Sequence, residues 1–348
     1  MAALRSRLPG VKLEALGGPA MAAAGATVRF PLERYTVMGL VEVLAGVPRH
    51  WRLLRRLERD FRARRYDLVL LLDYPGFNLR LAEAAKRSGL PVLYYIAPKY
   101  WASGPGRIPR LGRAVDRLAV ILPFEPEFFA RHGVTAEFVG HPLLDQPRSP
   151  SRAEARRRLG IAGGEKLLAL FPGSREQELT RLWPAFRDAA RLLLAGGSCD
   201  RVVLAARRGA HYPGADGFVL HQDDSATILA AADAALVKSG TATLEAALAE
   251  VPMVVAYRLH PLTAILARRA ITVPWISLVN LIAGRRVVAE LTQNAVTPTA
   301  LAAAVTPLLD PDGDAARSQR SALREIGRRL GEPGAARRVA EIAAGLLS

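Results

Sequence analysis

Short apolar runs alternate with amphipathic stretches along the first half of the chain. A continuous apolar run that ends in turn residues is typical of a strand covered on both faces of a sheet. In 51–65, Trp51, Leu54, Leu57 and Phe61 recur at helical spacing, and the opposite side is almost entirely Arg. The pattern predicts strands at 11–16, 67–72, 91–96, 118–122 and 136–139, and helices at 31–44, 51–65 and 79–88.

A Pro- and Ser-rich stretch at 145–158 interrupts this alternation, and we place a domain boundary there. Strands separated by helices imply βαβ units and parallel sheets. The sequence therefore predicts an α/β protein with Rossmann-like domains at 1–146 and 147–314, a helical tail at 315–348, and a ligand in the cleft beyond the carboxyl ends of both sheets. The second half predicts strands at 166–171, 202–205, 234–237, 253–257 and 275–278, a helix at 178–194, and a tail helix broken near 331–334.

Composition narrows the class of protein. Half of the 348 residues are apolar, which excludes a disordered chain. The single cysteine, Cys199, excludes an internal disulfide framework and a cysteine-rich zinc site. No run reaches the roughly 18 apolar residues of a membrane-spanning helix, and 1–30 shows no signal-peptide pattern. The six histidines lack metal-ligand spacing, and no Gly-x-Ser-x-Gly elbow supports serine hydrolase chemistry.

The charge points to anionic partners. The net charge is +16, and residues 1–150, with 23 basic and 13 acidic residues, carry +10 of it. Phosphorylated small molecules, an anionic membrane or nucleic acid would suit this excess, but no aromatic stacking platform or nucleic-acid motif is visible. The stretch 51–65, with Trp51, Arg55 and Arg59, fits a membrane surface. It fits a core-packed helix with a solvated basic face equally well.

Two strand-end segments carry candidate chemistry. Asp73 follows the apolar run 67–72, where a carboxylate can accept a proton from a hydroxyl group; a turn or cap aspartate is the structural alternative. Gly173, Ser174 and Arg175 lie between a strand and a helix. Backbone N–H groups at a helix start attract anions and Arg pairs with phosphate, although an ordinary turn would look the same.

Further polar residues follow later strands. Ser239, Gly240 and Thr241 allow a backbone to approach a diphosphate, and Glu245 one turn later suits a ribose hydroxyl pair or a capping role. Two such loops in one domain favour nucleotide binding, although neither is a Walker motif or a Gly-x-Gly-x-x-Gly fingerprint. A structural role suits the lone His141. A second set of polar residues is suited to contacts with a sugar or a base, or to a solvated helix face. It consists of Asn280, Arg285, Glu290 and Gln293.

Seven segments in order resemble signatures of the lipid-A-disaccharide synthase family, which are glycosyltransferases of the GT-B architecture. The resemblance covers nearly the whole chain. It rests on 35–44 (YTVMGLVEVL), 73–78 (DYPGFN), 123–127 (PFEPE), 138–143 (FVGHPL), 172–175 (PGSR), 239–245 (SGTATLE) and 280–285 (NLIAGR).

The resemblance implies an inverting transferase that joins UDP-2,3-diacylglucosamine to 2,3-diacylglucosamine 1-phosphate and releases UDP. Asp73 matches a candidate general base and Arg175 an arginine near the leaving diphosphate. The resemblance also implies no metal or cofactor, a peripheral site on the cytoplasmic face of the inner membrane, and acceptor contacts by Trp101; a homo-oligomer stays open. The implied nucleotide-sugar residues are Gly173, Ser174, Ser239, Gly240, Thr241, Glu245, Asn280, Arg285, Glu290 and Gln293.

The sequence departs from the family pattern at three places. The expected first strand and its GExSGD loop are missing, and 1–4 matches the helix that follows them, so we expect either an upstream start or a defective copy, with a gap in the first sheet. Ser103 stands where a second tryptophan is usual, and 205–216 is short. A non-catalytic nucleotide-sugar-binding paralogue, or another UDP-sugar enzyme of the same architecture, is the alternative.

Overall fold

A computed structural model describes residues 1–348 except 33–34, 36–39, 148, 223, 261–262 and 265–270. The chain forms two compact units. The N-terminal unit combines Met1–Asp145 with Gly331–Ser348, and the C-terminal unit is Gln146–Leu330. The predicted tail is thus divided between them, because α14 (Asp314–Arg329) belongs to the C-terminal unit and α15 (Ala335–Gly345) to the N-terminal unit.

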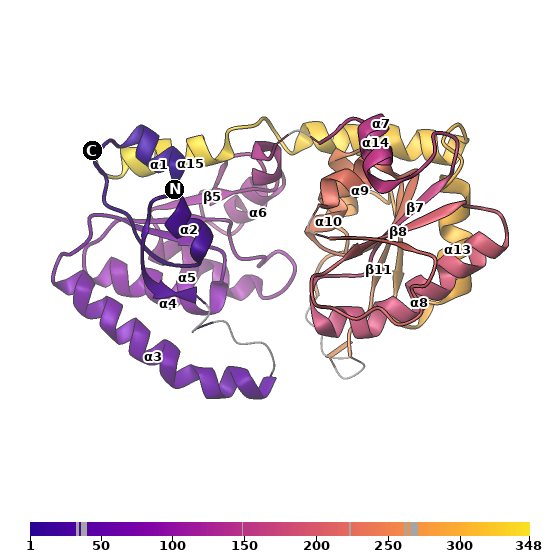
Figure 1. The fold of residues 1–348 in the computed structure, drawn as a ribbon. Helices are drawn as coiled ribbons and strands as arrows, with labels where there is room; N and C mark the ends of the chain where they lie inside the picture. The colour runs from indigo at the N-terminus through magenta and orange to yellow at the C-terminus, as the bar shows by residue number, and fades with distance from the viewer. Residues whose placement is uncertain (33–34, 36–39, 148, 223, 261–262, 265–270) are drawn as a thin grey trace. The chain divides into compact units, whose positions relative to one another are not determined.

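The C-terminal unit contains one six-stranded sheet in the order β12-β11-β10-β7-β8-β9, and all neighbours are parallel (Figure 1). Its strands are β7 (Leu167–Phe171), β8 (Arg201–Ala206), β9 (Val219–Gln222), β10 (Ala234–Lys238), β11 (Met253–Tyr257) and β12 (Ala289–Thr292). Its other helices are α7 (Arg152–Leu159), α8 (Glu176–Ala195), α9 (Ser225–Ala231), α10 (Thr241–Leu248), α12 (Leu278–Ala283) and α13 (Pro298–Val305).

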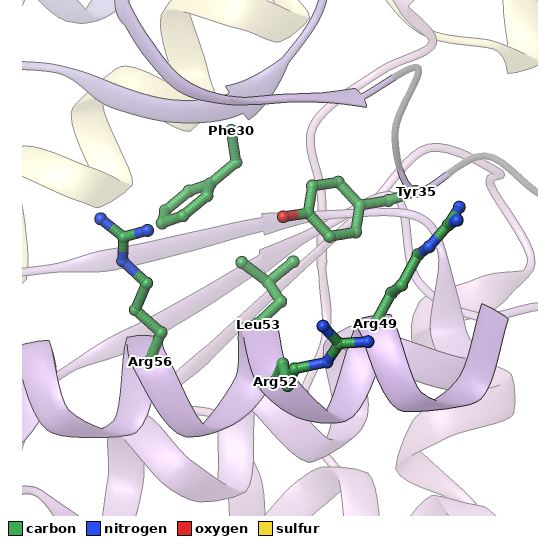
Figure 2. A pocket seen from close by; sticks show the side chains of 6 residues that line it. All are labelled: Phe30, Tyr35, Arg49, Arg52, Leu53 and Arg56. Carbon is green, nitrogen blue, oxygen red and sulfur yellow. The ribbon is translucent and has the colours of Figure 1, made fainter.

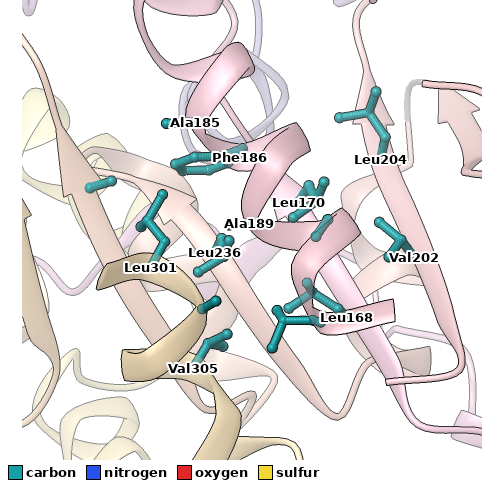
Figure 3. Close-up of a cluster of buried hydrophobic side chains, with 14 of the residues drawn as sticks. Leu168, Leu170, Ala185, Phe186, Ala189, Val202, Leu204, Leu236, Leu301 and Val305 are labelled. Atoms are coloured by element: carbon teal, nitrogen blue, oxygen red, sulfur yellow. The ribbon is translucent and has the colours of Figure 1, made fainter. Parts of the chain in front are cut away.

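The core of this unit explains the continuous apolar runs in its sequence. All five residues of β7 are buried, because helices cover both faces of the central strands. On one face, Leu168 and Leu170 pack against Phe186 of α8 and Leu301 of α13 (Figure 3). Burying one such side chain contributes about 1.5–3 kcal/mol, so this layer holds the strand ends in place.

The N-terminal unit contains two separate parallel sheets, β1-β2 and β3-β4-β5-β6. This separation agrees with the gap expected in the first sheet. The strands are β1 (Glu14–Gly17), β2 (Thr27–Pro31), β3 (Val69–Leu72), β4 (Val92–Tyr95), β5 (Arg117–Val120) and β6 (Glu137–Phe138). The helices besides α15 are α1 (Ala2–Arg7), α2 (Pro19–Ala23), α3 (Leu40–Arg62), α4 (Pro75–Arg87), α5 (Ile108–Ala114) and α6 (Glu125–Ala130).

Two clusters stabilise the N-terminal unit on opposite faces of its larger sheet. Leu57 and Phe61 of α3 pack with α4 and β3 in one cluster, which also holds Phe30 of β2. In the other, Leu4 of α1 packs with Val339 of α15, and these two helices lie side by side (Figure 1). The first and last helices of the chain therefore share a core.

Several elements differ from the sequence predictions. The stretch 275–278 is not a strand, because Ser277 caps α12 by accepting a hydrogen bond from the N–H of Val279 at 3.1 Å. The sheet is completed instead by β9 and β12, which the pattern missed, as it missed β2. Pro31 ends β2. Of the expected helix 31–44, residues 33–34 and 36–39 lie outside the described residues, and α3 begins at Leu40. The segment that connects β8 to β9 is fully described and contains no helix.

Candidate functional site

The connections of the C-terminal unit change direction between β7 and β10. From β7 the chain moves outward to β8 and β9, and from β10 it moves the other way to β11 and β12. Ligands of open α/β sheets bind beyond the carboxyl ends of the strands at such a switch point. The loops at Gly173–Arg175 and Ser239–Gly240 follow these two strands, so the structure brings both predicted loops to that edge.

The loop after β7 is organised around a carboxylate of the chain itself. Glu178 Oε2 accepts hydrogen bonds from the N–H groups of Ser174 (3.1 Å) and Arg175 (3.3 Å) at the start of α8. Gly173 has a φ of 123°, and a Cβ there would lie 2.7 Å from the Cβ of Glu178, so only glycine fits. The two N–H groups that sequence reasoning offered to an anion are therefore already satisfied by Glu178.

Glu178 also links the two loops. Its Oε1 lies 2.8 Å from Nζ of Lys238, the last residue of β10, and 3.8 Å from a guanidinium nitrogen of Arg175. Burial opposes ionisation of Glu178, but Lys238 and the loop N–H groups outweigh it and hold its pKa below the usual value. The Arg175 side chain is 73% exposed, so its charge faces solvent and is accessible to a ligand.

The loop after β10 is held by its own side chains. Ser239 is buried, and its hydroxyl donates to the carbonyl of Ile276 at 2.8 Å, which uses the group that the sequence assigned to a nucleotide. Gly240 precedes α10, and Thr241 begins that helix with an exposed side chain. Glu245 is half-buried and accepts from the Ser225 hydroxyl of α9 at 2.8 Å, so it does not cap its own helix.

Asn280 is completely buried and braces the turn between α12 and β12. Its Oδ1 accepts from the N–H groups of Val287 (2.7 Å) and Val288 (2.9 Å). Its Nδ2 donates to the Val288 carbonyl and to Glu290 Oε1. This corrects the alternative of a solvated helix face, and it leaves Asn280 with no group to offer a sugar or base.

Glu290 supports the same region from β12. Its two oxygens accept from the N–H groups of Ile276 (2.9 Å) and Ser277 (3.0 Å), just before α12. Of the predicted polar set, Arg285 has an exposed side chain, and Gln293 has a left-handed backbone with φ of 52°. Arg258, which sequence reasoning did not select, donates to the Gln293 carbonyl at 3.3 Å.

In the N-terminal unit, Asp73 and Tyr74 form a strained turn between β3 and α4. Both are left-handed, with φ of 46° and 49°, a conformation that costs a non-glycine residue about 1–3 kcal/mol. The Asp73 carbonyl is fixed by hydrogen bonds from Asn78 Nδ2 and Tyr94 Oη, each at 2.7 Å. The Asp73 side chain is exposed, and no hydrogen bond or ion pair joins it to another described residue. The turn therefore holds this carboxylate open to solvent at the end of β3.

The aspartate turn is also tied to α3. Tyr74 Oη lies 2.9 Å from Nε2 of His50, and the His50 ring lies 5.7 Å from that of Phe77. Tyr35 packs edge-on against His50 with ring centroids 6.0 Å apart. Sequence reasoning missed His50, and the large distance from 50 to 74 along the chain gave no signal for this contact.

Trp101 does not offer the exposed ring that a membrane contact needs. It is 6% exposed and donates to Glu125 Oε1 at 3.0 Å. The other oxygen of Glu125 accepts from the N–H groups of Ile121 and Leu122. Burial raises the pKa of Glu125 to about 7. This buried pair holds together the loops after β4 and β5, and the acceptor contact expected of Trp101 stays a prediction.

Burial shows where His141 and the apolar side chains of α3 lie. His141 is 4% exposed, its Nδ1 accepts from the Leu143 N–H, and burial, with Lys99 nearby, lowers its pKa to about 4, which agrees with a structural role. Leu54 and Leu57 are buried in the protein core and do not face outward. Trp51 is the exception, because it is 48% exposed. The exposed side chains of α3 include Trp51, Arg55, whose guanidinium lies 5.5 Å from the Trp51 ring, and Arg59.

Solved structures share this architecture at low sequence identity. The S. aureus MnaA–UDP co-structure aligns with a TM-score of 0.64 and 13% identity over 99% of this chain and 93% of that one. Arabidopsis thaliana UGT89C1 complexed with UDP aligns with a TM-score of 0.63 and 16% identity over 99% and 95%. These likenesses confirm the predicted fold class, α/β with the two Rossmann-like units of the GT-B architecture.

Sequence comparisons are more specific. A lipid-A-disaccharide synthase of Anaeromyxobacter sp. (strain K) is 42% identical over 351 residues, which cover 97% of this chain and 91% of the relative. One from Pseudomonas aeruginosa (strain LESB58) is 43% identical over 320 residues, 89% and 85% of the two chains. The family model described as lipid-A-disaccharide synthetase matches residues 1–338. With so much of its length matched, the chain belongs to the lipid-A-disaccharide synthase family.

Proposed function

We propose that the protein is an inverting glycosyltransferase that joins UDP-2,3-diacylglucosamine to 2,3-diacylglucosamine 1-phosphate, giving the β-1,6-linked disaccharide and UDP. Family membership and the names of its relatives support the reaction. The observation that carries the mechanism is the strained turn that presents the exposed, unbonded carboxylate of Asp73 at the end of β3.

In this mechanism Asp73 is the general base. The 6-hydroxyl oxygen of the acceptor forms a bond to the anomeric carbon of the donor, and its proton passes to Asp73. The bond from that carbon to the diphosphate oxygen breaks, and UDP leaves with the electron pair. The exposed Arg175 guanidinium stabilises the negative charge that grows on the leaving diphosphate.

The donor nucleotide is assigned to the switch-point edge of the C-terminal unit. The groups available to contact it directly are Arg175, the α10 start at Gly240 and Thr241, and the free oxygen of Glu245. Arg285 comes just before β12, at the amino-end edge of the sheet, so a contact from it stays a prediction. Ser239, Asn280 and Glu290 act as positioning residues, because their polar atoms are bonded to the chain. Gly173 and Gln293 supply left-handed turns around them, and the Ser174 N–H donates to Glu178.

The test is to incubate the purified chain with both acylated sugars and measure UDP and disaccharide. Asp73→Asn keeps a residue that tolerates the left-handed backbone and removes the base, so we expect kcat to fall by about 10²–10⁴-fold. Asp67→Asn, at another exposed aspartate before β3, is the matched control and should keep full rate. Full activity of Asp73→Asn would contradict the base assignment, and UDP binding without any turnover would favour the non-catalytic alternative.

The same proposal places the protein on the cytoplasmic face of the inner membrane. None of the helices in the described part of the chain is long and apolar enough to cross a bilayer. Trp51, Arg55 and Arg59 are exposed together on α3, where an aromatic ring and two guanidinium groups suit an anionic lipid surface. Binding to vesicles that contain anionic lipid should fall as salt rises. Salt-independent binding, or none, would contradict this placement.

A further inference from the structure

A pocket of about 450 Å³ lies between α3 and the end of β2 in the N-terminal unit. Its described lining consists of Phe30, Tyr35, Leu53 and three arginines of α3, Arg49, Arg52 and Arg56 (Figure 2). Its volume falls within the range of about 300–1,000 Å³ that is typical of small-molecule sites.

Helix geometry aligns the lining residues of α3. Positions 49, 52, 53 and 56 follow the i, i+3, i+4, i+7 spacing that places side chains on one helical face. Figure 2 shows these side chains standing on the same side of α3, opposite Tyr35 and Phe30. The stripe differs from that of Trp51, Arg55 and Arg59, which recurs every four residues and does not line the pocket.

The pocket has an apolar floor beneath a cationic rim. Phe30 and Leu53 are 7% and 3% exposed, whereas the three arginines are exposed. The Arg56 guanidinium lies 5.1 Å from the Phe30 ring centroid. No described lining residue carries a carboxylate, so the polar groups among them are the three guanidinium groups and the Tyr35 hydroxyl, which suit an anion. The floor suits a hydrocarbon chain.

Among the described residues, the rim arginines have no carboxylate partner. Arg29, whose guanidinium also lies over the Phe30 ring, differs because it pairs with Asp60 at 2.7 Å. Within the described part of the chain, Arg49, Arg52 and Arg56 form no ion pair. Arg52 Nε donates to the Pro48 carbonyl at 3.3 Å, which leaves its charge without a counter-ion among the described residues. Three such guanidinium groups over one cavity match the charge of a phosphate monoester, which Arg binds through paired N–H···O bonds.

The pocket also connects to the aspartate turn. Tyr35 lines the pocket and packs against His50, and His50 hydrogen-bonds to Tyr74, the residue after Asp73. A ligand seated in the pocket therefore lies against the same aromatic group that supports the proposed base.

We infer that this pocket binds a phosphate monoester that carries a hydrocarbon chain, with the phosphate on Arg49, Arg52 and Arg56 and the chain on Phe30 and Leu53. This inference rests on the proposed function and deepens it: the occupant is the phosphate end of the acylated acceptor. The membrane-facing stripe of α3 and the acceptor pocket are then two different surfaces of one helix.

Binding can be measured without turnover. Calorimetric titration of the full chain with monomeric dodecyl phosphate should show saturable binding, about tenfold or more tighter than octyl phosphate, because four more methylene groups reach the floor. Inorganic phosphate alone should bind at least about tenfold more weakly than octyl phosphate for the same reason. Equal binding of all three probes would overturn the inference.

Matched charge variants then locate the site. The triple variant Arg49→Gln, Arg52→Gln, Arg56→Gln should bind dodecyl phosphate about 30-fold or more weakly, because three charge-assisted contacts are lost. The control Arg7→Gln, Arg62→Gln, Arg113→Gln removes the same charge from exposed positions outside the pocket and should change affinity less than about threefold. Equal losses in both variants would show a general charge effect and overturn the inference.

Steady-state kinetics and vesicle binding distinguish an acceptor pocket from a membrane-binding surface. If the proposed reaction is present, the triple variant should raise the acceptor KM about tenfold or more and leave the UDP-sugar KM unchanged. An unchanged acceptor KM would overturn the pocket while the proposed function stands. Without turnover, the titrations still decide the pocket. A triple variant that loses binding only to phosphatidic acid vesicles, and keeps monomeric dodecyl phosphate, would assign the arginines to a membrane surface and overturn the inference.

Discussion

Glu178 and Glu290 in the C-terminal unit each accept two backbone N–H groups, whereas the carboxylate of Asp73 in the N-terminal unit is exposed and has no bonded partner among the described residues. The sheets differ as well. The C-terminal unit has one six-stranded sheet, and the described strands of the N-terminal unit are divided between two sheets. In the C-terminal unit, the internally bonded polar groups around Glu178, Asn280 and Glu290 form a fixed frame. In the N-terminal unit, the charged side chains of the candidate site are open to a ligand.

This difference suits two kinds of ligand. A frame of internally satisfied polar groups positions few atoms with high precision, as a nucleotide requires. Open arginines and one strained turn accept a larger amphiphilic molecule. Substitutions in the frame should therefore reduce stability first, and substitutions at the open charges should reduce binding first.

The largest expected effect tests the frame at Asn280. Asn280→Ala leaves the N–H groups of Val287 and Val288 without partners in a fully buried site, which should lower the free energy of unfolding by about 4 kcal/mol. Urea denaturation gives the loss, and hydrogen exchange should place it in the C-terminal unit. The exposed Asn294→Ala is the control, expected within about 0.5 kcal/mol of wild type. A similarly small loss for Asn280→Ala would remove the distinction between frame and open site.

The next prediction asks whether the N-terminal unit has a frame of its own around Glu125. Because burial raises the pKa of this carboxyl to about 7, its folded form favours the neutral acid. The stability it contributes is present below about pH 4.5 and is lost as pH rises to 7, by at most about 3 kcal/mol. The stability difference between wild type and Glu125→Gln should therefore decline over this window.

The difference between the two proteins is the proper readout for Glu125. His141, whose pKa is lowered to about 4, loses its stabilising contribution as pH falls from its ordinary pKa, and this contribution cancels in the difference. Unfolding measured at half-unit steps from pH 4 to 8 checks the slope. A flat difference would mean that the Glu125 carboxyl titrates normally.

A smaller effect is expected at Glu178. Its pKa is lowered, so its contribution is present above the ordinary carboxyl pKa and lost as pH falls below about 4. Glu178→Gln should cost about 1–2 kcal/mol at pH 7, and the cost should shrink towards pH 3. Glu176→Gln, at a side chain that is 75% exposed, should cost less than about 0.5 kcal/mol at either pH. A pH-independent loss for Glu178→Gln would exclude the charge as the cause.

The smallest effect concerns Asp145, which joins the two segments of the N-terminal unit. Its carboxylate accepts hydrogen bonds from the N–H groups of Gly334 and Ala336 at the start of α15. Asp145→Asn should destabilise this unit by about 1 kcal/mol, as the loss of a helix cap does. Hydrogen exchange of α15 measures it, with the exposed Asp216→Asn as control. Unchanged exchange in α15 would show that the cap is dispensable.

Strands with continuous apolar runs were predictable, because burial on both faces leaves a pattern that needs no tertiary knowledge. β7 and β10 are examples. β2, β9 and β12 were not, since each is only partly buried and has no continuous apolar run. The expected strand at 275–278 was wrong because its apolar residues precede a helix whose cap, Ser277, resembles a turn.

The candidate site was predictable in its residues but only partly in their roles. The apolar runs before them predicted that Asp73 and Arg175 follow strand ends. The sequence did not show that the polar atoms of Asn280 and Ser239 are bonded within the chain. The acceptor pocket could not be predicted from the sequence. One wall is Phe30 of the missed strand β2, and without that wall the pocket arginines Arg49, Arg52 and Arg56 cannot be distinguished from the other arginines of α3.

The shared core of α1 and α15 has a consequence for how the chain folds. Leu4 packs with Val339, Ala340 and Ala343, so α1 leaves the ribosome long before its packing partner α15, with Gln146–Leu330 between them. The C-terminal unit, an uninterrupted segment, can fold as it leaves the ribosome. The N-terminal unit closes its core only afterwards, over a long loop whose closure entropy grows with the logarithm of its length. A chain that stopped before Gly331 would lack the α15 side chains that pack in one cluster with Leu93 and Ala119, and α1 would lose its packing partner.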